Sequence, residues 1–417
     1  MTAMTVDCYT SGGLLPLERA RQQIETTFAC LCESEAATLG DALGRVLADD
    51  VASRIQIPAF DNSAMDGYGI RCADLNGDGP TVLRVQSRIA AGDARCEMLG
   101  AGAAVRIFTG APVPPGVDAV VMQEKCEVRD GTVVVPHGVR PGENVRPAGG
   151  DVAVGDVVLR AGTILQAQHI GMAAALGLDR LPVRRRLRVA VLSTGNELRE
   201  GSGPLPHGCI FDSNRHSVAA LLRRFGCQVT DFGIVTDEPD IIQTVLADAA
   251  AGHDMVVTSG GMSVGEEDHV KGAVRGLGHL DFWRVALKPG KPVAIGRIRD
   301  AVFLGLPGNP VSALVTFLLL GGPLVLRLSG AAVLPLVGYP LPAGFHMRVK
   351  GGRREFVRGW TQPDGTGALT TMVVGTQSSG ALSSMTGATG LIDLGAAPRE
   401  VHPGDMVTYI PFSHLLP

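Results

Sequence analysis

The sequence predicts a multidomain protein in which a doubly wound α/β domain is combined with β-rich domains. Three observations lead to this fold class. The chain has 417 residues, which corresponds to about two to four domains at roughly 100–200 residues per domain. Strand-like runs alternate with amphipathic helical segments from about 186 to 330, the pattern of a parallel α/β sheet. The 55 Gly and 26 Pro residues imply many turns in the rest of the chain.

The N-terminal part is predicted to be partly helical. Between residues 14 and 50, apolar side chains recur at helical spacing, for instance Leu43, Val46 and Leu47. Residues 151–185 begin with an extended run, DVVL, and continue with a helical one, QHIGMAAALGL. Because this second segment resumes the character of the first, the residues between them are interpreted as an insertion.

That insertion, residues 55–150, is predicted to be a separate β-rich domain. Short apolar runs at Thr81–Val85, Ala104–Phe108 and Ala119–Met122 alternate with Gly and Pro residues. The stretch CEVRDGTVVV contains an Asp-Gly turn between strand formers.

The remaining two domains follow from a change of pattern near residue 330. Before it, the strand-like runs RVAVLS, FGIV and MVVTS are separated by two segments with helical spacing of apolar residues. The apolar residues of the first segment are Val218, Leu221, Leu222 and Phe225, and those of the second are Ile241, Ile242, Val245 and Leu246. After it, GRREFVRG, ALTTMVV and DMVTYIPF are strand-like and are separated by Gly-rich turns. A small β domain therefore closes the chain.

The composition is typical of a globular protein, and we expect a cytoplasmic one. The formal net charge of −4 gives no nonspecific attraction to nucleic acid. The first residues lack the basic and apolar regions of a signal peptide. The most apolar stretch, Val311 to Leu326, is broken by GGP and is shorter than the roughly 18 residues that span a bilayer. The eight cysteines show neither CxxC nor zinc-ligand spacing, so we expect reduced thiols.

Three unusual loops in the α/β domain are the expected site, because ligands of an open parallel sheet bind beyond the carboxyl ends of its strands. The loop Ser193–Glu197 follows RVAVL, Thr258–Asp268 follows MVV, and Gly305–Ser312 precedes an apolar helix. The second loop has paired glycines, whose N–H groups can approach an anion, and carboxylates at 266–268 that suit a hard metal ion. Together the loops predict a site for a phosphate-bearing, metal-assisted ligand.

Each of these features has a structural alternative. One such loop alone is equally well explained as a simple turn, and it is the occurrence of three in one domain that favours a site. GGMSVG is not a GxGxxG dinucleotide fingerprint, and PGKP lacks the Ser or Thr that a P-loop needs after its lysine. Taken alone, Lys288 and Lys291 are more simply explained as solvated lysines, and Asp61 and Asp66 as turn formers.

Several long motifs nevertheless occur together and in one order: PAFDNSAMDGYG, RIFTGAPVPPGVDAVVMQE, VLSTGNEL, IFDSNRHSV, TSGGMSVGEEDHVK, FWRVALKPGKPVAIG, FLGLPGNPVSALVTF and, more loosely, GRREFVRG with SSGALSSMTGATGLIDL. In these motifs the chain resembles the molybdopterin molybdenumtransferase family, known as MoeA in bacteria and as the E domain of gephyrin. The resemblance covers nearly the whole chain, and so many ordered motifs make it highly specific.

The resemblance implies an elongated protein of four domains. Residues 1–54 and 151–185 would form a mixed α/β N-terminal domain that makes the dimer, and residues 55–150 an inserted β-rich domain. Residues 186–330 would form an α/β domain similar to the molybdopterin adenylyltransferase fold, and 331–417 a C-terminal β-barrel domain. Family members are homodimers whose active site lies between the α/β domain of one subunit and the inserted domain of the other.

The implied reaction converts adenylylated molybdopterin and molybdate into molybdenum cofactor, with Mg²⁺-dependent release of AMP. Carboxylates that hold Mg²⁺ would offset the charge of the phosphates, and cations would hold molybdate, which is a tetrahedral dianion. The implied protein partners are the upstream molybdopterin adenylyltransferase and downstream molybdoenzymes or cofactor carriers, with no nucleic acid and no membrane.

The resemblance also implies roles for individual residues. The catalytic residues are Asp66, Thr109, Asp151 and Glu197. The residues that bind the substrate and its nucleotide part are Thr194, Gly195, Asp237, Ser259, Gly260, Gly261, Ser263, Pro307, Gly308 and Asn309. The molybdate-binding residues are Lys288, Lys291, Arg353 and Ser379. The metal ligands are Glu197, Asp237 and Asp268.

One departure and three rival functions remain. Gly150, before Asp151, stands where the family usually has glutamate. A molybdopterin adenylyltransferase would need only the α/β domain, and a competence-damage or nicotinamide-nucleotide hydrolase would not explain the inserted β motifs. A scaffold, like the gephyrin E domain that anchors receptor tails, is a third possibility because fold does not determine function. The retained acidic and lysine positions favour catalysis.

Overall fold

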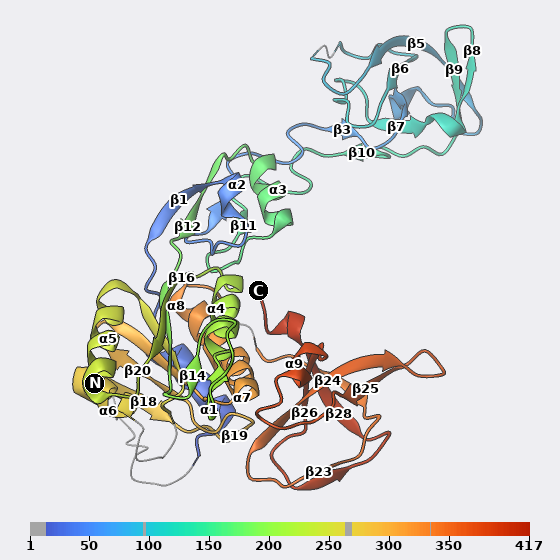
Figure 1. Ribbon diagram of the computed structural model, residues 1–417. Coiled ribbons are helices and arrows are strands. Elements are labelled where there is room, and N and C mark those ends of the chain that lie inside the picture. The colour runs from blue at the N-terminus through green and yellow to red at the C-terminus, as the bar shows by residue number, and fades with distance from the viewer. Residues whose placement is uncertain (1–13, 95–96, 263–268, 334) are drawn as a thin grey trace, which may run out of the picture. The chain divides into compact units, whose positions relative to one another are not determined.

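A computed structural model describes residues 14–94, 97–262, 269–333 and 335–417 (Figure 1). The chain divides into two compact units. The first contains the described residues of Met1–Asp49, together with Ala161–Ile170 and Arg180–Pro417. The second contains Asp50–Arg160 and Gly171–Asp179.

The α/β domain of the first unit contains a six-stranded sheet. In spatial order its strands are β16 (Gln228–Val235), β13 (Arg188–Thr194), β17 (Met255–Ser259), β21 (Ala301–Leu306), β20 (Ala294–Ile298) and β18 (Gly278–Trp283). The first four strands are parallel, as predicted, but β20 is antiparallel to both of its neighbours. Only Arg299 and Asp300 connect β20 to β21, and so short a connection can join only antiparallel strands.

Helices cover both faces of this sheet, so the doubly wound prediction is confirmed. Val189 and Val191 of β13 pack in one hydrophobic core, and Ala190 and Leu192 pack in the other, as the alternation of side chains along a strand requires. The first core also receives α1 (Leu17–Thr27), α4 (Asn214–Arg224), α7 (Pro310–Thr316) and α8 (Gly322–Leu328). The second receives α5 (Pro239–Gly252) and α6 (His269–Leu277) (Figure 1).

The apolar stretch near residue 320 is longer than the sequence indicated. Among the described residues, Pro310–Leu328 is the one helical run long and apolar enough to cross a membrane, with a mean hydropathy of 2.0, and 83% of its most apolar window is buried inside the protein. The GGP sequence does not break it. A π-helical turn, Phe317–Gly321, precedes Pro323, which then lies in the first turn of α8 where no N–H donor is needed.

The C-terminal domain is built on a curved sheet. Its strands, in order, are β19 (Leu287–Lys288), β24 (Arg354–Pro363), β26 (Gly390–Asp393), β28 (Met406–Pro411) and β22 (Tyr339–Pro342), with β25 (Leu369–Val373) also paired to β24. A bridge between Ala343 and Thr371 connects the end of β22 to β25, so the sheet curves back on itself as in a barrel. A separate pair is formed by β23 (Met347–Val349) and β27 (Arg399–Val401).

The second unit contains the predicted β-rich domain. Its six-stranded sheet has the order β7 (Ala119–Met122), β4 (Gly67–Ile70), β6 (Ala103–Ile107), β5 (Thr81–Ile89), β9 (Thr132–Val135) and β8 (Glu127–Arg129). The predicted Asp-Gly turn joins β8 to β9, with positive φ angles at Asp130 and Gly131. Three short strand pairs accompany these sheets: β2 (Val51–Ala52) with β11 (Val157–Leu159), β3 (Asn62–Ser63) with β10 (Val145–Arg146), and in the first unit β1 (Ser34–Thr38) with β12 (Arg180–Arg184).

The helical prediction around Leu43 is wrong, whereas the one at QHIGMAAALGL is confirmed by α3 (Ala167–Ala175). The short helix α2 (Leu39–Ala42) ends before Leu43, which is 58% exposed. Gly44 then adopts a φ of 73°, a conformation that ends helices, and Val46 forms a β-bridge with Ile164.

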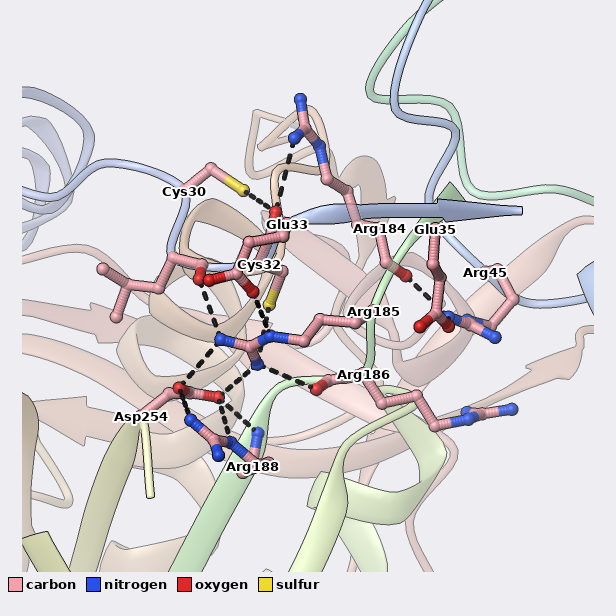
Figure 2. Close-up of polar contacts among 11 residues, drawn as sticks. Cys30, Cys32, Glu33, Glu35, Arg45, Arg184, Arg185, Arg186, Arg188 and Asp254 are labelled. Atoms are coloured by element: carbon pink, nitrogen blue, oxygen red, sulfur yellow. Dashed lines mark hydrogen bonds and ion pairs between the residues drawn. The ribbon is translucent and has the colours of Figure 1, made fainter. Parts of the chain in front are cut away.

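A network of charged side chains fixes the start of two central strands in the α/β domain (Figure 2). Asp254 immediately precedes β17, and its carboxylate accepts a hydrogen bond of 2.8 Å from the backbone N–H of Arg188, the first residue of β13. The guanidinium of Arg188 binds the same carboxylate at 2.8 Å, and that of Arg185 binds it at 2.6 and 3.0 Å. Arg185 also pairs with Glu33.

The Asp254 network predicts a specific loss of stability in acid. Burial alone would raise the pKa of Asp254, but the hydrogen bonds from Arg188 and Arg185 outweigh it and lower the pKa to about 2. Since the unfolded value is about 3.9, this stabilisation is complete above about pH 4 and is lost as the pH falls toward about 2. After allowance for solvent screening of the arginines it amounts to about 1–2 kcal/mol.

The measurement is hydrogen exchange of the β13 and β17 amides between about pH 5 and 3. The expected pH dependence of their opening free energy disappears in Asp254→Asn, which is also less stable at neutral pH because Arg185 and Arg188 lose their partner. Asp300→Asn, an exposed residue in the β20–β21 turn of the same sheet, should behave like the unmodified protein. An unchanged pH dependence in Asp254→Asn would refute the assignment.

Candidate functional site

A cavity of about 850 Å³ lies in the first unit, at the carboxyl ends of four neighbouring parallel strands. Each strand is followed by residues that line it. These are Asp237 after β16, Thr194, Gly195 and Glu197 at the end of β13, Gly260, Gly261 and Met262 after β17, and Pro307, Gly308 and Asn309 after β21. The loops singled out in the sequence therefore meet at one edge of the sheet, as the rule for open α/β sheets predicts.

Glu197 and Asp237 supply the carboxylates at this edge. The backbone N–H of Asn196 donates to Asp237 Oδ2 at 3.3 Å, and the N–H of Asp237 donates to the side-chain oxygen of Asn196 at 3.2 Å. This reciprocal pair holds the β13 loop against the β16 loop. Glu197, the next residue, is exposed at the cavity.

The paired glycines permit a close approach between the β13 and β17 loops. Gly260 has a φ of 93°, and a Cβ atom there would lie 2.4 Å from the carbonyl oxygen of Thr194. The Thr194 hydroxyl lies in this corner. Thr194 is 3% exposed, and its Oγ1 has no hydrogen-bond partner among the described residues. A buried polar group without a partner is destabilising, so this hydroxyl marks a corner of the wall where a hydrogen-bond partner is missing among the described residues.

Ser259 is buried and does not line the cavity, although the sequence placed it among the binding residues. It supports the wall instead. The side-chain amide of Asn214, the first residue of α4, donates to Ser259 Oγ at 2.8 Å and to the carbonyl oxygen of Gly308 at 2.6 Å. These bonds fix the β21 loop against β17.

The opposite wall carries positive charge from two parts of the chain. Lys288, Lys291 and Arg353 line the cavity, as does Ser379. Lys288 lies opposite Glu355 in the pairing of β19 with β24, and its Nζ is 2.6 Å from Glu355 Oε1. Lys291 is exposed and has no ion pair with a described residue. The cavity thus combines carboxylates on the strand ends with cations on the facing segments.

Arg358 is a cavity residue that the sequence reasoning missed. It is 1% exposed and lies on β24 beside the loop that holds Ser379. Its Nε donates to Ser384 Oγ at 3.0 Å, and its Nη2 donates to the carbonyl oxygens of Thr376 at 3.3 Å and Ser378 at 3.0 Å. Burial lowers the pKa of Arg358 to about 10, partly offset by the charge of Glu355, so it remains protonated at neutral pH.

No sequence pattern distinguished Arg358. The run GRREFVRG contains three arginines. Arg354 and Arg358 lie on the same face of β24, yet packing buries Arg358 whereas Arg354 pairs with Asp393 and Glu18. Because both faces of β24 are buried from Glu355 to Gly359, the alternation of side chains does not distinguish Arg358 from its neighbours.

The other predicted catalytic residues lie in the second unit. The Thr109 hydroxyl and backbone N–H donate to Asp66 Oδ1 at 2.7 and 2.8 Å. These bonds, the backbone one first, hold the pKa of Asp66 below its usual value. Asp151 is exposed, and its N–H donates to the carbonyl oxygen of Ile57 at 3.0 Å. At Gly150 a Cβ atom would lie 3.1 Å from the carbonyl oxygen of Pro147, a tight but adjustable contact.

Two predicted residues, Ser263 and Asp268, lie outside the described residues. The donor set that remains for a divalent cation is Glu197 and Asp237, and no group of three possible metal-binding side chains occurs among the described residues. Mg²⁺ is usually held by one or two carboxylates together with substrate phosphates and water. Two carboxylates lining one cavity fit that requirement.

Comparisons with family models cover most of the chain. The MoeA N-terminal region (domain I and II) matches residues 15–177, a probable molybdopterin binding domain matches 190–327, and the MoeA C-terminal region (domain IV) matches 340–412. The second match contains the four strand ends of the cavity, and the third contains Arg353, Arg358 and Ser379.

Individual relatives agree with this assignment. Molybdopterin molybdenumtransferase from Haemophilus influenzae is 39% identical over 405 residues, which cover 97% of this chain and 100% of that protein. Molybdopterin molybdenumtransferase 2 from Mycobacterium tuberculosis is 40% identical over 305 residues, 71% of this chain and 75% of that protein. The crystal structure of a molybdopterin biosynthesis MoeA protein from Pyrococcus horikoshii has a TM-score of 0.82 at 28% identity and covers 95% of this chain and 100% of that chain.

Gly260→Ala should distort the cavity wall. The substitution places a methyl group 2.4 Å from a backbone oxygen at a positive φ, so we expect the free energy of unfolding to fall by about 2–4 kcal/mol. Gly308→Ala is the matched control, because its Cβ would approach nothing closer than 3.9 Å. Thermal unfolding of both variants measures the difference. Equal losses in the two variants would contradict the proposed close approach.

Proposed function

Because the chain belongs to the molybdopterin molybdenumtransferase family, we propose that it inserts molybdenum from molybdate into adenylylated molybdopterin, with Mg²⁺-dependent release of AMP. The transferase class and its place in molybdenum cofactor biosynthesis follow from the family. The adenylylated form of the substrate, the Mg²⁺ requirement and the assignment of residues are the parts proposed here. The observation that carries them is a single cavity lined by carboxylates at the strand ends and by a group of cations that includes one carboxylate, Glu355, paired with Lys288.

The cationic wall is the proposed molybdate site. Molybdate is a tetrahedral dianion, so it needs several fixed donors and positive charge. Lys291 and Arg353 supply the charge, Lys288 supplies an ammonium group that is paired with Glu355, and Ser379 supplies a hydroxyl. Arg358 adds a fourth cation that its hydrogen bonds to the 376–378 loop hold in place.

The strand-end wall is the proposed site for the phosphates and the nucleotide part of the substrate. Glu197 and Asp237 would hold Mg²⁺, with Asp268 as a further candidate ligand. When bound, the ion would offset the phosphate charge during cleavage of the adenylyl group. The Thr194 hydroxyl and the loops that carry Gly195, Gly260, Gly261, Ser263, Pro307, Gly308 and Asn309 would contact the rest of the substrate, while Ser259 acts through Asn214.

We further propose that the active form is a homodimer. In it, Asp66, Thr109 and Asp151 of one subunit would act with the cavity of the other. The hydrogen bonds from Thr109 keep Asp66 ionised, as a residue that holds a cation or orients water would need to be. A cytoplasmic location, and transfer of substrate and product to and from the neighbouring enzymes of the pathway, complete the proposal.

The first test is molybdate-dependent AMP release and molybdenum incorporation by the purified protein with adenylylated molybdopterin and Mg²⁺. We expect Lys291→Ala to raise the KM for molybdate about tenfold or more, since one charge-assisted contact is worth about 1.5–3 kcal/mol. Lys350→Ala removes an exposed lysine of the C-terminal domain that does not line the cavity, and it should leave the KM unchanged. Turnover that needs neither molybdate nor Mg²⁺ would exclude the proposed reaction.

Subunit complementation tests the dimer. Asp66→Ala and Lys291→Ala should each be nearly inactive at low molybdate, because each removes one half of both sites. When the two variants are unfolded, mixed and refolded together, the mixed dimers contain one site with neither substitution, so part of the activity should return. If mixed dimers form but no activity returns, both residues act in a site within one subunit.

A further inference from the structure

Two arginines of the second unit face each other across neighbouring strands. Tyr68 of β4 lies opposite Arg106 of β6, and Arg106 lies opposite Arg88 of β5, so the three residues form one row across the sheet. The guanidinium carbons of Arg88 and Arg106 lie 4.5 and 4.6 Å from the centroid of the Phe108 ring. The two guanidinium carbons are therefore separated by no more than the sum of these two distances.

This arrangement is unfavourable for the protein alone. Like charges directly opposite each other on paired strands are destabilising. Within the described part of the chain, neither arginine forms an ion pair with a carboxylate. Arg106 donates to the carbonyl oxygen of Gly67 at 3.1 Å and to the side-chain oxygen of Gln123, which orients it without neutralising its charge. The guanidinium of Arg106 also lies over the Tyr68 ring, 5.1 Å from its centroid. These ring contacts orient the two cations and do not neutralise their charge.

The pair lies beside residues already proposed to act in the reaction. Phe108 directly precedes Thr109, which binds Asp66, and Asp66 directly precedes β4. The end of β6, the end of β5 and the start of β4 lie at the same edge of the sheet because β5 is parallel and β4 antiparallel to β6. Two guanidinium groups without a direct ion pair among the described residues therefore share one edge with the Asp66–Thr109 pair, and the charge of Arg106 contributes to the lowered pKa of Asp66.

We propose that Arg88 and Arg106 form a phosphate-binding site at this edge, which takes the phosphate groups of the adenylylated substrate. The inference rests on the function and the homodimer proposed above: the second unit of one subunit would share the phosphates with the strand-end wall of the other. Guanidinium groups match phosphate oxygens with paired N–H donors. The Phe108 ring already contacts both guanidinium groups, so the arginine donors rather than the ring are available to a ligand.

Binding of inorganic pyrophosphate to the full chain, measured by isothermal titration calorimetry at low salt, tests the site. Arg88→Gln should weaken binding about tenfold, because it removes charge-assisted bonds, and Arg88→Lys should weaken it less. Arg88 is exposed and its guanidinium lies over the Phe108 ring, so its replacement should not unfold the domain. Arg84→Gln is the matched control: Arg84 is exposed on the same strand, opposite Ala103 and Thr132, and its removal should change affinity less than twofold.

The cavity of the first unit could also bind pyrophosphate, so Lys291→Ala is titrated in parallel. If Lys291→Ala loses pyrophosphate binding while Arg88→Gln binds it as tightly as the unmodified protein, the inference is overturned. Measurements of enzymatic turnover distinguish failure of this inference from failure of the proposed function. In an active protein, Arg88→Gln should raise the KM for adenylylated molybdopterin and leave the KM for molybdate unchanged, whereas an unmodified protein that never inserts molybdenum would refute the proposed function itself.

Discussion

The cavity depends on the pairing of β19 with β24. In the sequence β19 lies between two strands of the α/β sheet, whereas β24 is the long strand of the C-terminal domain. Their pairing sets Lys288 opposite Glu355, and the N–H of Arg354 donates to the carbonyl oxygen of Ala286 at 2.8 Å. A second attachment, from the N–H of Val311 to the carbonyl oxygen of Ser379 at 3.1 Å, ties the C-terminal loop to α7. Without these contacts the strand ends and the cations would not enclose one space.

The same pairing balances the charge of the cavity. Glu355 is 7% exposed and would be costly to bury alone, but Lys288 neutralises it. Arg358, three residues along β24, has no ion pair with a carboxylate of the described residues and is instead satisfied by one hydroxyl and two carbonyl oxygens. These acceptors compensate the loss of water but leave the positive charge in place. The corner near Ser379 therefore keeps a positive potential that an oxyanion can use.

Much of this could be predicted from the sequence, because strand-end loops in a parallel sheet must meet at one edge. Thr194, Gly260 and Asn309 were identified in this way and line one cavity. The direction of β20 was missed because periodicity does not report strand direction, and Gly44 ended a helix that apolar spacing alone predicted. Arg358 and Glu355 were missed for a related reason. Both faces of β24 are buried at these residues, so their role depends on how the strand packs against segments that are distant in sequence.

Charged groups in this protein fall into two kinds: some stabilise the fold, and others are available to bind a ligand. At Asp254 every charge has a partner of opposite sign, and the network joins two strands at the end of the sheet opposite to the cavity. At Arg88 and Arg106 the charges are alike and close, and neither has a direct ion pair among the described residues. Buried polar atoms without a partner in the described part of the chain occur at the cavity, as in Thr194, and also away from it, as in Gln23 and Asp281. An unpartnered hydroxyl alone therefore does not indicate a ligand, whereas two like charges beside Asp66 and Thr109 are better explained by an anion that completes them than by imperfect packing.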